Sequence, residues 1–349
     1  MKAAVLTEYR KIEWKDVPAP AIGDSDALVR VTYASICGSD QHVFNGEFHP
    51  RSRLPLIQGH EFVGVIEDIG SNVRGFKRGD RVAADPIYWC GKCPACLRGH
   101  YPACTTLKLI GIDSDGGFAE YAAVRDFMLY LVDPAISDRY AALIEPYAIG
   151  FHASKRAGVR QDDTLAMFGA GKIGQSIIQA ARTITRNTVI AVDVVPERLA
   201  ILSRAYPDIV TVNAREEDPV DVIKERTHGK GVDIAFEAVG EPRTIEGRVN
   251  PVRQAIRSIR GGGKVCVLSL GDNEVSVVFK ELIWKEGILV TSRVSHGEFR
   301  DAIEHLAKGD LRPDAMITAE LPMSRAQEVY EMLEREPGKY LKVLLKPDA

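Results

Sequence analysis

Short apolar runs alternate with amphipathic stretches through the middle of the chain. Residues 163–168 have the composition of a short buried strand, and residues 175–182 carry apolar side chains at helical spacing. Similar apolar runs further along predict strands at residues 188–193, 231–236, 263–268 and 288–291. Because strands that alternate with helices form parallel sheets, this pattern predicts an α/β fold with a doubly wound parallel sheet.

The pattern is different near both ends of the chain. Alternating apolar and polar residues predict strands at residues 27–32 and 62–66, and Gly, Pro and Asp turns lie between them. Such spacing is typical of an antiparallel, barrel-like sheet. Towards the end, a helix is predicted near residues 298–308 and a final strand at residues 340–345.

These changes of pattern divide the chain into three segments. We predict a β-rich domain at residues 1–148, an inserted α/β domain at residues 149–293, and a return to the first domain at residues 294–349. The length of 349 residues agrees with two domains, at about 150 residues per domain. The sequence shows no internal repeat, low-complexity segment or long linker.

A glycine-rich turn joins the first strand of the predicted parallel sheet to its helix. Gly169, Gly171 and Gly174 have the Gly-x-Gly-x-x-Gly spacing, with Lys172 and Ile173 between them. The first glycine allows a tight turn, the second lets the backbone approach a pyrophosphate, and the third lets the helix pack on the strand. Since the unpaired amides of the helix N-terminus face the phosphates, the turn predicts a dinucleotide site.

Asp193 ends the next predicted strand, 24 residues after Gly169, close to the spacing of about 20 residues expected for a ribose-binding carboxylate. A carboxylate here repels a 2′-phosphate, so NAD is predicted over NADP. Arg198 is predicted to lie over the adenine ribose. Ligands bind at the carboxyl ends of parallel strands. The residues expected there are Val239, Ser269, Leu270, Thr291, Ser292 and Arg293.

Four of the six cysteines lie close together, at positions 90, 93, 96 and 104. The two-residue gaps allow the thiolates to point into one tetrahedron, and four thiolates make a closed, structural zinc site. An iron–sulfur cluster is the alternative, but the ferredoxin run has three residues before its last cysteine and a proline after it. Here the gap before Cys104 is seven residues and Thr105 follows it. Four unrelated loop cysteines remain the simplest alternative.

The other two cysteines have different surroundings. Cys266 lies in an apolar strand pattern and is predicted to be a core residue. Cys37 has polar residues close after it, and His60 follows within 23 positions. Each alone is more often a core side chain, but together with the cysteine lobe they suggest a second zinc site.

Composition narrows the classes of function. Hydrophobic residues are 45% and charged residues 27%, as in ordinary globular proteins. The net charge of −3 gives no basic excess for nucleic acid or an anionic membrane surface. No apolar stretch approaches the roughly 18 residues of a spanning helix, and charges near the start argue against a signal peptide. We therefore expect a cytoplasmic protein, with its thiols reduced.

These residues resemble the zinc-dependent medium-chain dehydrogenase family over essentially the whole chain. The resemblance also includes Gly59-His60-Glu61 and the turn at residues 79–82. Glu145 stands where liver-type alcohol dehydrogenases place a third zinc-binding cysteine, which makes the chain similar to the polyol and sugar-acid branch of sorbitol, threonine and hexonate dehydrogenases. The resemblance implies a Rossmann domain inserted into a β-rich, GroES-like catalytic domain.

The resemblance also implies the ligands of a catalytic zinc. Cys37 and His60 would bind the metal directly. Glu61 would be a third ligand or an exchanging one, and Glu145 would be a fourth ligand or would hold a zinc-bound water. Asp40 would orient His60 from behind.

Two further residues would serve the substrate in such an enzyme. Ser39 would contact its hydroxyl, and His42 would pass the proton on through the cofactor ribose. Loop arginines at positions 51, 53 and 293 are candidates to meet a substrate carboxylate or a row of hydroxyls.

The resemblance implies an oxidoreductase with two zinc ions and NAD. It would move a hydride from a secondary alcohol of a polyol or sugar acid, such as a hexonate, to NAD and leave a ketone. A homodimer or homotetramer is implied, without a nucleic-acid or membrane partner. A threonine 3-dehydrogenase-like enzyme and a simple alcohol dehydrogenase are alternatives. A zinc-free quinone reductase and a non-enzymatic, zinc-stabilised nucleotide-binding protein also stay open, and zinc content would distinguish them.

Overall fold

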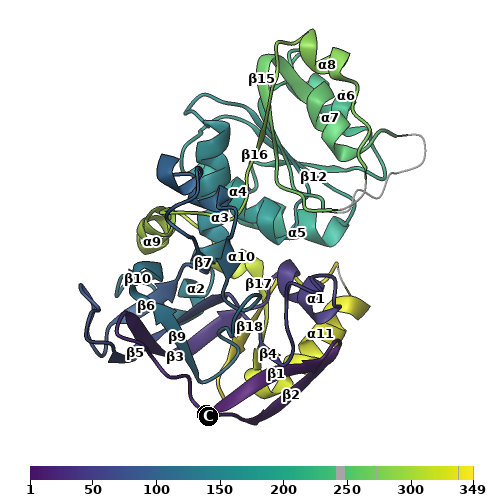
Figure 1. The fold of residues 1–349 in the computed structure, drawn as a ribbon. Coiled ribbons are helices and arrows are strands. Elements are labelled where there is room, and N and C mark those ends of the chain that lie inside the picture. Colours follow the sequence, from purple (N-terminus) through teal and green to yellow (C-terminus); the bar gives the residue numbers. More distant parts are fainter. Residues whose placement is uncertain (241–247, 272–273, 337, 349) are drawn as a thin grey trace. The chain divides into compact units, whose positions relative to one another are not determined.

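The computed structural model describes residues 1–240, 248–271, 274–336 and 338–348. The chain forms two compact units (Figure 1). Unit 1 consists of Met1–Ala148, Ser295–Gly309 and Ile317–Ala349. Unit 2 consists of Ile149–Val294 and Asp310–Met316.

Unit 2 is built on a six-stranded sheet in which every described pair of neighbouring strands is parallel. The spatial order is β13-β12-β11-β14-β15-β16, so the sheet grows outward in both directions from β11. This is the doubly wound arrangement predicted from the sequence. The strands are β11 (Leu165–Phe168), β12 (Val189–Asp193), β13 (Val210–Asn213), β14 (Val232–Glu237), β15 (Ile259–Val267) and β16 (Ile288–Thr291).

Helices cover both faces of this sheet (Figure 1). Because side chains alternate along a strand, Leu165 and Met167 pack in one core with α3, α4 and α5, whereas Ala166 and Phe168 pack in the other with α6, α7 and α8. Among the described helices, none is both long and apolar enough to cross a membrane. The bounds are α3 (Ile144–Ala157), α4 (Lys172–Arg182), α5 (Pro196–Ala205), α6 (Pro219–Arg226), α7 (Pro251–Ser258), α8 (Phe279–Ile283) and α10 (Pro313–Met316).

Unit 1 contains a seven-stranded sheet in the order β10-β6-β5-β3-β18-β17, and β9 pairs with β3. A smaller sheet has the order β2-β1-β4, and β7 pairs with β8. The strands are β1 (Lys2–Glu8), β2 (Lys11–Asp16), β3 (Asp26–Ser35), β4 (Leu56–Ile57), β5 (Glu61–Ile69), β6 (Arg81–Ala84), β7 (Ile87–Tyr88), β8 (Lys108–Leu109), β9 (Tyr121–Arg125), β10 (Leu129–Leu131), β17 (Ile317–Pro322) and β18 (Lys342–Lys346). The helices are α1 (Gly38–Phe44), α2 (Asp138–Ala141), α9 (Phe299–Ala307) and α11 (Ala326–Arg335).

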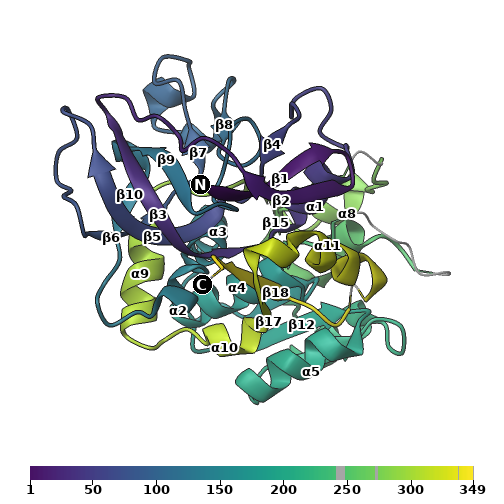
Figure 2. The ribbon, with the colours of Figure 1, turned by 90° about the horizontal axis from the view of Figure 1, so that it is seen from below.

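The larger sheet of unit 1 joins the two ends of the chain. β3 pairs antiparallel with β18, with Ser35 opposite Leu344 and Ala34 opposite Leu345. β17 and β18, both from the last part of the chain, pair in parallel and lie beside α11 in Figure 2. The predicted fold class is therefore confirmed: a parallel α/β sheet is inserted into a β-rich unit whose strands come from both ends.

Helix α3 begins earlier than its sequence indicated. Because a proline disfavours helical geometry in the residue before it, Pro146 led us to expect an extended segment at Glu145 and a helix from Ala148. That expectation is wrong, since α3 starts at Ile144 and includes both residues. A proline in the first turn of a helix costs little, because the amide it lacks has no partner inside the helix.

Candidate functional site: a buried thiol, imidazole and carboxylate cluster

Three metal-ligating side chains meet in the interior of unit 1. Cys37 lies just after β3 and is the N-cap of α1, His60 directly precedes β5, and Glu61 is its first residue. Their exposed fractions are 9%, 3% and 0%. One ligand atom from each lies within 4.8 Å of the other two. Strand pairing positions them, because β3 and β5 are neighbours and Glu61 lies opposite Ser35.

Asp40 fixes the geometry around Cys37 and His60. Its Oδ1 lies 3.2 Å from His60 Nδ1, and its Oδ2 accepts the backbone N–H of Cys37 at 2.8 Å. The other ring nitrogen, Nε2, lies 3.3 Å from the hydroxyl of Ser39. Burial opposes protonation of His60, but Asp40 and Cys37 outweigh it and raise its pKa well above the ordinary value. The imidazole is thus oriented with Nε2 towards Cys37 and Ser39.

Glu61 is held by an ion pair that no sequence pattern indicated. The Nζ of Lys342, on β18, lies 2.5 Å from each Glu61 oxygen, and the Ser35 hydroxyl donates to Oε2. Both members of the ion pair are fully buried. Burial alone would raise the pKa of Glu61, but Lys342 outweighs it and lowers that pKa. Glu61 is therefore an ionised carboxylate whose two oxygens already have donors.

The surroundings of Glu145 differ from those of Glu61, because one Glu145 oxygen has no donor among the described residues. Glu145 is the second residue of α3 and is 5% exposed. Its Oε2 has no hydrogen-bond partner among the described residues. Burial, followed by the negative charges of Glu61 and Cys37, raises its pKa well above the ordinary value. An unsatisfied buried acceptor is costly, so this oxygen fits a cation or a donor supplied from outside the chain.

The donor set fits a zinc ion. Thiolate sulfur, imidazole nitrogen and carboxylate oxygen are the ligands that zinc takes in proteins. Charge points the same way, because Cys37 as thiolate, Asp40, Glu61 and Glu145 are four buried acidic groups, whereas the buried cations beside them are Lys342 and, when protonated, His60. A divalent cation would offset much of this negative charge, whereas burial without it favours protonation.

His42 lies further along α1, towards the surface. Its Nδ1 pairs with Glu47 Oε2, and its ring stacks on Phe48 with 5.9 Å between the ring centroids. The predicted proton path through His42 remains a prediction. Arg51 is already paired: its Nε and Nη2 donate to both oxygens of Asp113, at 2.9 and 2.7 Å. A substrate carboxylate would have to displace Asp113 to bind it.

The four-cysteine lobe is a second candidate metal centre of unit 1. Cys90, Cys93, Cys96 and Cys104 bring their sulfurs within 4.8 Å of one another, and all six cysteines of the chain are free thiols. The N–H of Cys93 donates to Cys90 Sγ, and that of Cys90 donates to Cys104 Sγ, both at 3.4 Å. Backbone donors from Cys96 and Thr105 lower the pKa of Cys93 to about 5. These donors favour a thiolate, which is the form that binds zinc.

In unit 2 the glycine turn has the predicted geometry. Gly169 has a φ of +96°, and a Cβ there would come within 2.8 Å of the Ala238 carbonyl oxygen. A Cβ on Gly174 would come within 1.8 Å of the Gly169 carbonyl oxygen, so that close approach requires glycine. Gly171 is the N-cap of α4 and supplies no side-chain cap. The first amides of α4, including those of Lys172 and Ile173, therefore lack a side-chain cap.

Asp193 anchors the turn, a role that the sequence did not reveal. Its Oδ2 accepts the N–H of Ala170 at 2.7 Å, and its Oδ1 accepts those of Val194 and Val195 at 2.7 and 2.9 Å. Arg198 Nη1 lies 3.7 Å from Oδ2. Asp193 therefore ties the end of β12 to the glycine turn, and Oδ2 keeps acceptor capacity for a hydroxyl group.

The other predicted cofactor residues lie at or just after the carboxyl ends of β14, β15 and β16, namely Val239, Ser269, Leu270, Thr291, Ser292 and Arg293. Glu237, at the end of β14, joins two of these segments: its oxygens accept the Ser269 hydroxyl at 2.5 Å and the Val239 N–H at 2.9 Å. Sequence reasoning missed Glu237. The available signal was an acidic residue ending an otherwise apolar strand.

Comparison with known proteins identifies the family. Residues 23–134 match the model of the alcohol dehydrogenase GroES-like domain, and residues 173–308 match that of the zinc-binding dehydrogenase. The sorbitol dehydrogenase of Bacillus subtilis (strain 168) is 32% identical over 352 residues, which cover 100% of this chain and 98% of that relative. An L-threonine 3-dehydrogenase of Bacillus velezensis is 31% identical over 99% of both chains.

Solved structures are also similar over the whole chain. Short chain alcohol dehydrogenase (rspB) from E. coli CFT073, complexed with NADH, has a TM-score of 0.90 and 27% identity over 99% of both chains. A putative zinc-binding dehydrogenase from Sinorhizobium meliloti 1021, bound to NADP, has a TM-score of 0.89 and 29% identity over 99% of both chains. L-idonate 5-dehydrogenase from Escherichia coli has a TM-score of 0.84 and 25% identity, over 99% of this chain and 97% of that one.

The two matched domains, relatives of full length and the cluster around Cys37 and His60 agree with one another. The chain belongs to the zinc-dependent medium-chain dehydrogenase family, in its polyol branch.

Proposed function

We propose that this dehydrogenase oxidises a secondary alcohol of a polyol or sugar acid to a ketone, with two zinc ions per chain and NAD as the hydride acceptor. The observation that carries the proposal is the buried pair of Cys37 and His60. It is supported by the buried Glu145 Oε2, which has no hydrogen-bond partner among the described residues and belongs to a carboxyl group that interacts electrostatically with both. The glycine turn and Asp193 of unit 2 support the nucleotide part. We assign residues 149–293 to the nucleotide-binding domain and the rest of the chain to the catalytic domain.

Cys37, His60 and Glu145 would hold the catalytic zinc. Lys342 and Ser35 already occupy the Glu61 oxygens, so Glu61 would act as an exchanging ligand at most. When bound, zinc is a Lewis acid that lowers the pKa of a coordinated hydroxyl group, which favours loss of its proton. Cys90, Cys93, Cys96 and Cys104 would hold the structural zinc.

The surrounding residues of unit 1 orient the substrate and carry its proton. Asp40 fixes the imidazole of His60, so that Nε2 is presented on the side where Ser39 lies. The Ser39 hydroxyl would contact the reacting alcohol. His42, whose Nδ1 pairs with Glu47 Oε2, would then pass the proton on through the cofactor ribose.

For the cofactor, we infer a preference for NAD over NADP. The Asp193 carboxylate lies at the end of β12, where a 2′-phosphate would meet like charge. Solved relatives are complexed with NADH in one case and NADP in another, so the preference is a property to be measured on this chain. Arg198, next to the Asp193 carboxylate, would face the adenine ribose.

The substrate class rests on the relatives. The sorbitol and L-idonate enzymes act on a polyol and a sugar acid, which favours this class. L-Threonine is the second candidate, because several relatives are L-threonine 3-dehydrogenases. Arg53 is exposed and has no described ion pair, so it is a candidate to meet a substrate carboxylate.

A substrate panel tests the proposal. Zinc-loaded protein is offered sorbitol, other polyols, idonate, gluconate and L-threonine, with NAD or NADP, and NADH absorbance is followed. Turnover of a polyol or hexonate with NAD supports the proposal. Turnover of threonine alone establishes the second candidate, and no turnover of any secondary alcohol contradicts both. An Arg53→Gln variant should weaken binding of acids but not of neutral polyols.

A further inference from the structure

A polar hollow of about 580 Å³ lies on unit 2, away from the predicted cofactor residues. Gly231 precedes β14 and Arg260 lies at the start of β15, and both line the hollow. It is therefore at the amino ends of these strands, whereas the predicted cofactor residues follow their carboxyl ends. Six cationic side chains line it: Lys224, Lys230, Arg248, Arg257, Arg260 and Lys285.

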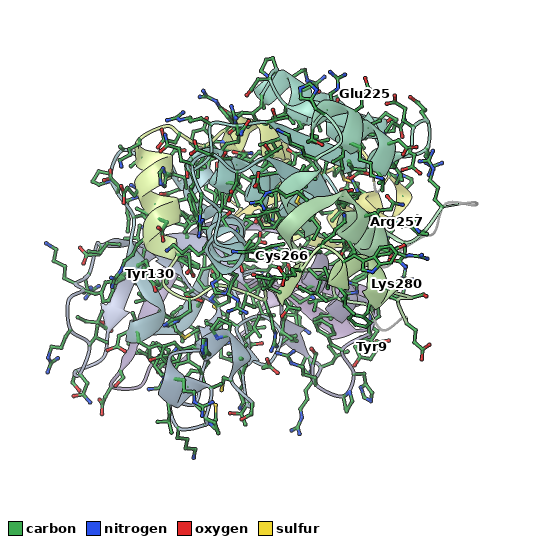
Figure 3. All side chains as sticks on the ribbon, turned by 90° about the horizontal axis from the view of Figure 1, so that it is seen from above. Tyr9, Tyr130, Glu225, Arg257, Cys266 and Lys280 are labelled. Atoms are coloured by element: carbon green, nitrogen blue, oxygen red, sulfur yellow. The ribbon has the colours of Figure 1, made fainter. Side chains whose placement is uncertain are left out.

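Two of the three arginines that line this hollow, Arg257 and Arg260, are paired with carboxylates, and Arg248 donates to the backbone carbonyl oxygens of Ala214 and Glu217. Arg257 Nη2 lies 2.8 Å from Glu281 Oε1, and Arg253 pairs with the same oxygen at 2.9 Å. These two guanidinium groups lower the pKa of Glu281 to about 2. Arg260 Nε donates to Asp233 at 2.5 Å. Figure 3 shows Arg257 and Lys280 on the same side of unit 2, whereas Cys266 lies in its interior. Arg257 and Arg260 thus line the hollow, but their charges are paired with carboxylates.

The three lysines of the hollow, unlike Arg257 and Arg260, have no carboxylate partner among the described residues. Lys285 Nζ donates to the carbonyl oxygens of Ile256, Arg257 and Ile259, at the end of α7, and makes no ion pair in the described residues. Burial, followed by the charge of Lys224, lowers the pKa of Lys285.

Lys224, on α6, and Lys230, in the turn before β14, are also without an ion pair in the part of the chain that the structure describes. Two acidic groups of the hollow do not compensate them. The Asp218 carboxylate is the N-cap of α6 and accepts the N–H of Val220 at 2.8 Å. Asp221 lies one turn before Lys224 but forms no described ion pair with it.

We propose that this hollow binds a multiply charged phosphate anion. Lys224 and Lys230 line one cavity and make no ion pair among the described residues, so a phosphate bound there would accept charge-assisted hydrogen bonds from both. Lys285, whose three N–H groups already go to backbone carbonyl oxygens, would add only its charge. Trp284 also lines the hollow and is 78% exposed, with Lys280 Nζ 4.6 Å from its ring. Its free face would let a phosphate ester with a flat ring bind more tightly than inorganic phosphate.

Calorimetric titration tests the proposal on zinc-loaded protein saturated with NADH, so that the cofactor site is filled. Inorganic phosphate and AMP are the probes, at pH 8 and low ionic strength. We expect one site per chain, and the Lys224→Gln, Lys230→Gln double variant should weaken both probes by about tenfold or more. Tighter binding of AMP that is lost in Trp284→Ala indicates a nucleotide-like ligand. Equal affinities indicate the inorganic anion.

A matched control changes two exposed lysines of unit 1, Lys77→Gln and Lys108→Gln, which gives the same change of net charge and should leave both affinities unchanged. Circular dichroism and dehydrogenase activity show that the double variant is folded. The proposal is overturned if the wild-type protein binds neither probe up to roughly 10 mM. It is equally overturned if the double variant binds both probes as tightly as the wild type does.

Discussion

Two buried glutamates act electrostatically on Cys37, and they differ in what surrounds them. Lys342 and Ser35 occupy the oxygens of Glu61, whereas Glu145 Oε2 has no hydrogen-bond partner among the described residues. A residue whose charge is already balanced gains little from a metal, while an unbalanced one gains most. On this contrast we propose the metal-facing role for Glu145, a choice that the sequence left open, although Glu61 is the carboxylate whose oxygen lies within 4.8 Å of the Cys37 and His60 ligand atoms.

Replacing Glu145 by Gln removes its charge and keeps its shape. Alcohol oxidation should fall by at least about 10–100-fold, the range seen when groups that orient or support a metal ligand are lost. NADH binding, measured by fluorescence, should stay unchanged, because the predicted nucleotide contacts lie in unit 2. Elemental analysis after dialysis should show a lower zinc content per chain, because one of the two zinc ions is bound more weakly. Full activity in this variant would contradict the assignment.

Lys342→Met should destabilise the protein because it leaves Glu61 buried without its cation. Breaking a buried ion pair costs roughly 3–5 kcal/mol, measured here as a lower free energy of unfolding in urea. The double variant Glu61→Gln, Lys342→Met should recover much of that loss. Lys346→Met is the matched control on the same strand: Lys346 is 51% exposed and lies 3.8 Å from Glu320, so its loss should cost under about 1 kcal/mol. Equal effects of Lys342→Met and Lys346→Met would refute this account.

At the scale of elements, the link between β6 and β7 carries a pH-sensitive group. Burial raises the pKa of Asp85 to about 7, and its Oδ1 accepts the N–H of Ile87 at 3.2 Å. In the unfolded chain its pKa is about 3.9. Between these values the folded protein holds a proton that the unfolded chain has lost. The contribution of Asp85 to stability is therefore present below about pH 4 and is lost as the pH rises to about 7.

Asp85→Asn keeps the acceptor but cannot ionise. The variant should match the wild type near pH 4 and exceed it at pH 8, by on the order of a few kcal/mol in the free energy of unfolding. Urea unfolding at both pH values measures this difference. Asp68→Asn is the control, since Asp68 is exposed and also accepts a nearby backbone N–H, from Ile69; it should show no such divergence. A constant difference between Asp85→Asn and wild type at both pH values would exclude titration of Asp85 in this range.

The two metal centres predict different losses when one cysteine is replaced. Fully loaded protein should contain two zinc ions per chain. Cys93→Ser should leave one zinc and lower the melting temperature, because structural zinc contributes directly to folding. Cys37→Ser should also leave one zinc but mainly abolish activity, with the fold retained. Elemental analysis, circular dichroism and thermal melting distinguish the two. A single zinc in fully loaded wild-type protein would refute the catalytic site.

Sequence periodicity predicted five of the six strands of unit 2, because buried parallel strands leave strong local patterns, but it did not predict β13 (Val210–Asn213), which has only one fully buried residue. The glycine turn and the cysteine lobe were equally visible, since their chemistry needs fixed spacing. Lys342 was not visible: its importance comes from pairing β18 with β3, across some 280 positions of sequence. The start of α3 was mispredicted because we expected Pro146 to keep Glu145 out of a helix, whereas a proline is tolerated in the first turn of a helix.

At the scale of the whole molecule, the proposed cofactor preference depends on Asp193. This residue anchors the glycine turn through Ala170, and we propose that it would also repel a 2′-phosphate. Asp193→Asn should therefore raise the ratio of NADP to NAD efficiency while keeping the turn. Asp193→Gly should lower kcat/KM for NAD by about tenfold or more, with only a small gain for NADP, because the anchor is lost as well. Steady-state kinetics with both cofactors test this. Equal efficiencies in the wild type would refute the NAD preference.

The pairing of β3 with β18 also sets an order of events during synthesis. All strands of unit 2 end by Thr291, but the larger sheet of unit 1 lacks β17 and β18 until residue 346 has been made. A nascent chain can therefore complete its parallel sheet while Glu61 still lacks Lys342. Until β18 arrives, that carboxylate lacks the lysine that pairs with it in the folded chain, so the surroundings of the buried Cys37, His60 and Glu61 cluster become complete only in the last stage of folding.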